Sequence, residues 1–164
     1  MRLLLVCVCV FLLGLSPALA GQCFSDKEAE AEQGIRIHSE LMVIGLNCQH
    51  NSTANGKNLY MAYRDFTSAH EKLFVAYEKI LLKSFKDSGE KNPEAALNTL
   101  RTNFANKISN DAARMRPDMF CQRYAPRIEK ASVMKYEDVR KWAATIFESH
   151  PVSKPLCASA KQGG

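Results

Sequence analysis

The sequence lacks the short motifs that identify the most common catalytic sites. Its 164 residues contain no G-x-S-x-G, no glycine-rich phosphate loop and no H-E-x-x-H. No histidine has a glutamate three residues before it, so the di-iron motif of helical bundles is also missing. A pair of glycosidase carboxylates would leave no such motif, because it is defined by separation in space. We expect a protein that is not an enzyme.

Long apolar segments are missing too, apart from one at the N-terminus. Arg2 precedes an apolar run from Leu3 to Leu15, and Ala18-Leu19-Ala20 supplies small residues after it. This run is shorter than the roughly 20 residues that span a bilayer, and the layout is typical of a signal peptide cleaved after Ala20. We expect residues 1–20 to be this peptide, so that the membrane matters only for export. The bacterial periplasm is the expected compartment, rather than eukaryotic secretion.

The remaining chain carries four cysteines, Cys23, Cys48, Cys121 and Cys157, and no C-x-x-C or C-x-x-C-H. A thioredoxin-type redox site and covalently attached haem are therefore not expected. An even number of cysteines in an exported domain predicts two disulfides. Spacing alone does not choose among the three possible pairings.

Apolar residues recur at intervals of three and four through most of the chain, which is the period of an amphipathic helix. Four main helices are expected, at about 25–48, 57–86, 92–116 and 136–148, with a short helix at 118–124 closed by Pro126. No segment alternates like a strand. The predicted fold is an all-α, disulfide-stapled, up-and-down bundle over residues 21–158, followed by a disordered tail at 159–164.

This topology favours one disulfide pairing. In an up-and-down bundle, the first helix starts at the end where the last helix finishes, which brings Cys23 to Cys157. The first and third helices both finish at the opposite end, which brings Cys48 to Cys121. Bridged Cα atoms must lie within about 7 Å of each other, so these two pairs are the expected ones.

Charge is divided unevenly along the chain. Residues 21–100 carry 9 basic and 11 acidic side chains, whereas residues 101–164 carry 12 basic and 6 acidic ones. The basic residues are scattered singly, so we expect a solvated helical surface, with an acidic partner as the alternative and nucleic acid excluded by export. In the first helix, Glu32, Arg36 and Glu40 are four residues apart and are expected to form a charged outer stripe.

His38 and His70 fall on or beside apolar helix faces, and Tyr63 lies on the main apolar stripe of the second helix. Two imidazoles on facing helices could bind a metal or a haem iron, and these three residues are the possible ligand-binding site. We expect instead ordinary core histidines, each held by one hydrogen bond, with no metal and no cofactor.

Two classes of function follow. The first is an exported, non-catalytic helical protein that binds a macromolecular partner, as an inhibitor, adaptor or chaperone does. The alternative is a periplasmic bundle that holds a small apolar ligand, haem or metal between its helices. The first fits the absence of catalytic motifs and the uneven charge, whereas the second requires the histidines to converge.

Overall fold

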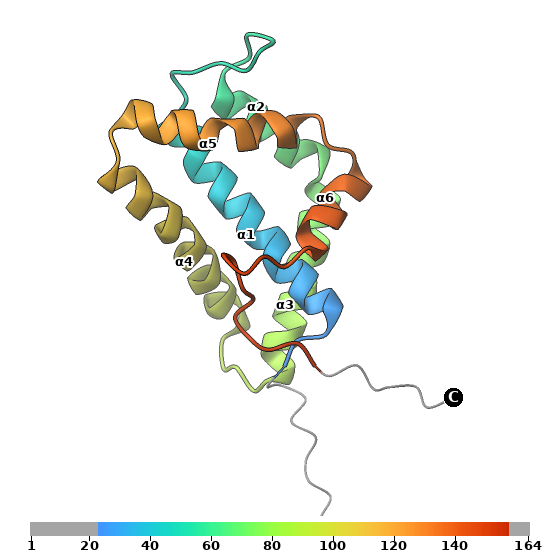
Figure 1. Ribbon diagram of the computed structural model, residues 1–164. Helices are drawn as coiled ribbons and strands as arrows, with labels where there is room; N and C mark the ends of the chain where they lie inside the picture. The colour runs from blue at the N-terminus through green and yellow to red at the C-terminus, as the bar shows by residue number, and fades with distance from the viewer. Residues whose placement is uncertain (1–22, 158–164) are drawn as a thin grey trace, which may run out of the picture.

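The structure, a computed structural model that describes residues 23–157, consists of helices joined by short loops (Figure 1). Its six helices are α1 (Asp26–Asn47), α2 (Leu59–Ala69), α3 (Glu71–Asp87), α4 (Pro93–Arg114), α5 (Pro117–Ser132) and α6 (Tyr136–Ala144). No strand forms between residues 23 and 157, and the prediction of an all-α fold is confirmed. The expected signal peptide (1–20) and tail (159–164) lie outside the described residues.

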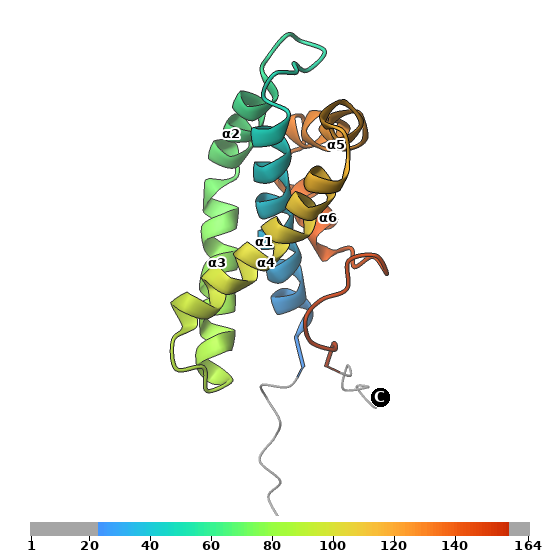
Figure 2. The same ribbon diagram turned by 90° about the vertical axis from the view of Figure 1, so that its left-hand side faces the viewer.

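Helix α1 occupies the centre of the molecule. It packs against all five other helices, and Figures 1 and 2 show it running through the middle of the fold in both views. Its apolar residues Ile35, Ile37, Leu41 and Ile44 are each at most 1% exposed, although they point to different sides of the helix. Because neighbours surround α1, even its polar residues are covered.

Side-chain caps set the starts of three helices. Ser25 accepts a hydrogen bond from the Glu28 amide, and the Glu28 carboxylate accepts one from the Ser25 amide at 2.8 Å. Asn58 and Asn92 likewise accept hydrogen bonds from amides in the first turns of α2 and α4. These contacts satisfy backbone donors that have no partner inside the helix.

The single helix expected at 57–86 is broken at His70. This residue ends α2 and begins α3, with φ −114° and ψ 17°. Its ring Nε2 lies 3.1 Å from the carbonyl oxygen of Met134, in the loop before α6. The break places the His70 side chain against a distant loop. No proline or glycine in the sequence marks the position of this break.

The short helix expected to close at Pro126 is longer than predicted. Helix α5 continues through Pro126 to Ser132, because its buried face repeats on both sides of the proline. Tyr124 and Ala125 precede Pro126 on that face, and Ile128 follows it. Pro126 itself is exposed, so water can reach the carbonyl group that loses its backbone donor.

The two disulfides lie at opposite ends of α1. Cys23, just before the helix, pairs with Cys157, and Cys48, just after it, pairs with Cys121 at the start of α5. These are the two expected pairs. Disulfides of this kind persist in oxidising compartments outside the cytoplasm.

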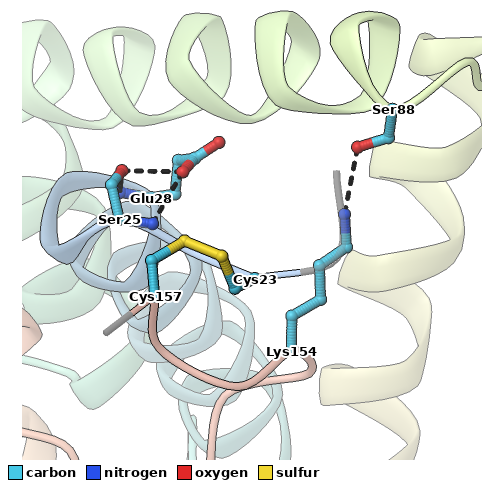
Figure 3. Close-up of a disulfide and its surroundings, with 6 residues drawn as sticks. All are labelled: Cys23, Ser25, Glu28, Ser88, Lys154 and Cys157. Carbon is cyan, nitrogen blue, oxygen red and sulfur yellow. Dashed lines mark hydrogen bonds between the residues drawn. A yellow bond between two sulfur atoms is a disulfide. The ribbon is translucent and has the colours of Figure 1, made fainter. Parts of the chain in front are cut away.

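Residues 145–157, here called the C-terminal strap, run from α6 back to the start of α1. At its far end, Phe24 and Leu156 form a parallel bridge. The Cys23–Cys157 disulfide follows (Figure 3). In the same view, the ammonium group of Lys154 reaches Ser88 at the end of α3, with an Nζ···Oγ distance of 3.1 Å. The strap is therefore fixed to two helices.

The up-and-down arrangement of about four main helices is not confirmed. Helices α1 and α3 lie side by side in both views, whereas α5 runs across the end of α1 (Figures 1 and 2). The last helix also ends earlier than expected, at Ala144. No helix between residues 23 and 157 combines the length and the apolar content that a membrane span requires.

Candidate functional site

His38 and Tyr63 lie together in the core between α1 and α2. The Tyr63 hydroxyl oxygen is 3.2 Å from Nε2 of His38. Burial lowers the pKa of His38, and the nearby Arg101 guanidinium lowers it further. Burial also raises the pKa of Tyr63. Both side chains are therefore held in their uncharged forms.

His70 does not join this pair. Its ring packs on Phe66, with centroids 5.0 Å apart, whereas His38 packs on Phe74 at 4.9 Å. The two phenylalanine rings meet edge to face. In the described part of the chain, no three His, Cys, Asp or Glu side chains are placed to hold a metal ion.

The expected charged outer stripe of α1 is wrong, because its residues are buried. Glu32 is 1% exposed, and Arg36 and Glu40 are each 4% exposed. The C-terminal strap and α5 cover this face of α1, and a spacing of four residues only shows that these side chains share one face. Buried charges need partners, and these partners define the candidate site.

Glu40 is the acceptor at the centre of this cluster. Its Oε2 accepts hydrogen bonds from Nη1 of Arg36 and from Nη1 of Arg127 on α5, both at 3.1 Å. Gln33 supports Arg36, whose Nε donates to its Oε1 at 2.6 Å. Gln33 Nε2 in turn donates to the carbonyl oxygen of His150 at 3.0 Å. The cluster thus joins α1, α5 and the strap.

His150 contributes little positive charge to this cluster. Burial lowers the pKa of its imidazole, and Arg36 lowers it further, with smaller contributions from Lys107 and Arg127. Glu40 acts in the opposite direction but does not outweigh them. Because burial is the largest cause, the lowered pKa reflects the loss of hydration first and the neighbouring basic groups second.

A cavity of about 340 Å³ opens beside these residues. Its lining combines basic, aromatic and polar side chains: Arg36, Arg127, Lys130, Met134, Trp142, Phe147, Ser149 and His150. We call this cavity the basic pocket. Lys107 of α4 lies near it, where its Nζ donates to the carbonyl oxygen of Ser149 at 3.2 Å.

Ser149, His150 and Glu40 have the residue types of a hydrolase triad. The Ser149 Oγ lies 2.8 Å from Nδ1 of His150, but Nε2 of His150 is 3.7 Å from the Glu40 carboxylate, beyond hydrogen-bonding distance. Glu40 is instead engaged by Arg36 and Arg127. A carboxylate held by two guanidinium groups is poorly suited to orient a catalytic base.

Sequence reasoning predicted the excess of basic residues after residue 100 but not the pocket. Arg36 belongs to the first helix, and Trp142 and Phe147 both fall within the last helix expected at 136–148. Phe147 instead lies in the strap and is 46% exposed. Comparison with family models, with curated proteins and with solved structures finds no match for this chain.

Proposed function

We propose that this chain is an exported, non-catalytic helical protein that binds an acidic macromolecular partner. The proposal includes removal of a signal peptide after Ala20 and residence in the bacterial periplasm. Two disulfides that join distant parts of the chain support an oxidising compartment.

The observation that carries the proposal is the charge of the basic pocket. Arg36, Arg127 and Lys130 line it, and Glu40, the buried carboxylate that pairs with Arg36 and Arg127, is 4% exposed. Lys130 has no hydrogen bond or ion pair with any described residue, so its charge is available to a partner. A concave surface with an excess of one sign attracts ligands of the opposite sign.

The alternative of a haem or metal held by His38 and His70 gains no support from the fold. Each histidine has its own partner, Tyr63 for the first and the Met134 carbonyl group for the second. These contacts are those of core histidines that satisfy one ring nitrogen each. A small organic ligand in the basic pocket is the form of the alternative that the geometry favours.

The experiment compares partner retention by three immobilised proteins in native extract. These are the mature chain, the double variant Arg127→Glu/Lys130→Glu and a control, Lys79→Glu, which reverses an exposed charge on α3. We expect the mature chain and the control to retain the same acidic protein, and the double variant to retain at least about tenfold less. Raising the salt from about 0.05 to about 0.5 M should release it. Equal retention by all three proteins would contradict the proposal.

A further inference from the structure

The base of the basic pocket contains an unused hydrogen-bond donor. The hydrogen bonds of Arg36 use Nε, toward Gln33, and Nη1, toward Glu40. Among residues 23–157, no acceptor engages its Nη2, although only 5% of this side chain is exposed and it lines the pocket. Nη2 remains accessible to solvent, so an acceptor on a ligand in the pocket can reach it.

The side chains around this donor carry an excess of positive charge, which favours binding of an anion. Arg36, Arg127 and Lys130 bring three positive charges to the pocket, and Glu40 compensates one of them. His150 adds a neutral ring with a polar edge. An added carboxylate can accept a charge-assisted hydrogen bond from the unengaged Nη2 of Arg36.

The lining of the pocket also includes apolar side chains. These belong to Met134, Trp142 and Phe147, and Phe147 is 46% exposed although it is a large aromatic side chain. The volume of about 340 Å³ lies at the lower end of the range for small-ligand pockets. A doubly charged, strongly hydrated group such as phosphate would lose more hydration beside these rings than a carboxylate would.

We propose that the basic pocket binds a carboxylate attached to an apolar body, with the carboxylate toward Arg36 and Lys130 and the body against Trp142 and Phe147. This inference rests on the proposed binding function and names the chemistry that its partner presents. In an acidic protein, that chemistry is a side-chain or terminal carboxylate next to an aromatic or aliphatic side chain. A free amphiphilic acid offers the same chemistry from another source.

Trp142 allows a direct test, because it is the single tryptophan of the chain and lines the pocket. Tryptophan emission of the mature, oxidised protein is followed during titration with 3-phenylpropionate and with its neutral analogue, 3-phenylpropanamide. We expect a saturable change with the acid and an apparent Kd at least about tenfold higher for the amide, which matches the loss of one charge-assisted hydrogen bond. No saturable change, or equal binding of acid and amide, would overturn the inference.

Two variants locate the binding. Lys130→Gln removes an unpaired charge and should raise the apparent Kd of the acid by about tenfold or less, without changing that of the amide. Lys79→Gln, on α3, should change neither Kd. Arg36 is left intact, because its removal would strand the buried Glu40. An acid affinity unchanged in Lys130→Gln would place the site elsewhere and overturn the inference.

Peptides separate the two sources of the carboxylate. A short peptide that ends in phenylalanine is titrated with a free and with an amidated C-terminus. Binding of the free peptide at least as tight as that of 3-phenylpropionate supports a protein partner, and binding of the small acid alone supports a free amphiphile. Loss of partner retention in Arg127→Glu/Lys130→Glu, without any response of Trp142 to the acids, would sink this inference and leave the proposed function intact. The reverse result, a response of Trp142 to the acids with unchanged partner retention in the double variant, would contradict the proposed macromolecular partner and support the carboxylate site.

Discussion

Glu32 on α1 accepts a hydrogen bond from the backbone amide of Ser153, with an N···O distance of 2.6 Å, although 121 positions separate the two residues. The Ser153 hydroxyl donates to the same carboxylate. Together with the Gln33–His150 contact and the Cys23–Cys157 disulfide, this bond fastens the C-terminal strap along α1. Because the strap supplies Phe147, Ser149 and His150 to the basic pocket, the Glu32 carboxylate supports the pocket from behind.

Replacing Glu32 should loosen the strap. Glu32→Ala removes a buried acceptor from two donors of Ser153, so we expect the free energy of unfolding to fall by about 1.5–3 kcal/mol. Chemical denaturation measures this loss, and limited proteolysis should cut the strap sooner. Glu148→Ala, which removes an exposed strap carboxylate with no described partner, is the matched control and should stay within about 0.5 kcal/mol of wild type. Equal stability of the two variants would show that the Glu32–Ser153 contact contributes nothing.

Gly34 provides a test of packing around α1. A Cβ atom at this position would lie 2.3 Å from Cδ2 and Cε2 of Tyr77, whereas one at Gly45 would meet its nearest neighbour, Cβ of Tyr63, at 3.4 Å. Gly34→Ala should therefore lower the free energy of unfolding by about 1–3 kcal/mol, even though alanine favours helix by up to about 1 kcal/mol. Gly45→Ala should be neutral or stabilising. Denaturation curves of the two variants measure the difference, and a stabilised Gly34→Ala would contradict the close packing of Tyr77.

The two disulfides should differ in their reactivity toward reductant. Cys48 is 0% and Cys121 1% exposed, whereas Cys157 is exposed and Cys23 is half-buried. Under native conditions we expect a mild thiol to open Cys23–Cys157 first, since exchange requires access to a sulfur atom. Alkylation followed by peptide mass spectrometry identifies the opened pair. Simultaneous opening of both would show that reduction proceeds only through global unfolding.

The all-α fold, the starts of α1 and α4 and the cysteine pairs could be predicted because they depend on local pattern and on chain topology. The capping box at Ser25 and Glu28 and the proline at the start of α4 are features that the sequence displays directly. The disulfides followed from which helix ends meet. Each of these features needs no knowledge of how deeply a given face is covered.

Predicting the basic pocket required knowing how deeply each helix face is covered. A repeat of four residues places Glu32, Arg36 and Glu40 on one face of α1. The same repeat would occur whether solvent or the strap covered that face. The course of the strap depends on contacts between residues more than 100 positions apart, such as Gln33 with His150. Sequence periodicity reports only neighbours within a few turns, so such contacts lie beyond it.

His38 should make stability depend on pH in one window. Burial lowers the pKa of His38 below its ordinary value of 6.5, so between these two values the unfolded chain binds a proton that the folded chain does not. The free energy of unfolding should therefore decrease as pH falls below about 6.5, and level off below the folded pKa. The measurement is urea denaturation at pH 7.5 and at about pH 5 for wild type, His38→Gln and the control His50→Gln, in the exposed loop. The decrease should be smaller in His38→Gln and unchanged in His50→Gln, and an equal decrease in all three proteins would assign the effect to other groups.

Pro126 offers a substitution that should stabilise the fold. A proline in a helix interior costs about 3 kcal/mol relative to alanine, because it removes a donor and crowds the preceding turn. Alanine also increases the freedom of the unfolded chain, which offsets about 0.4–1 kcal/mol of that gain. Because Pro126 is exposed and its neighbours on both sides are already helical, we expect Pro126→Ala to raise the free energy of unfolding by about 2 kcal/mol.

Thermal and urea denaturation measure this gain, with the Cys48–Cys121 disulfide intact in both proteins. Ala125→Gly, one position earlier in α5, changes the helix preference in the opposite direction and should destabilise it by about 1 kcal/mol or more. If Pro126→Ala were destabilised instead, the proline would have to stabilise α5 in a way that outweighs a restored backbone hydrogen bond. The continuation of α5 to Ser132 would then depend on the proline, rather than on the buried face formed by Tyr124 and Ile128.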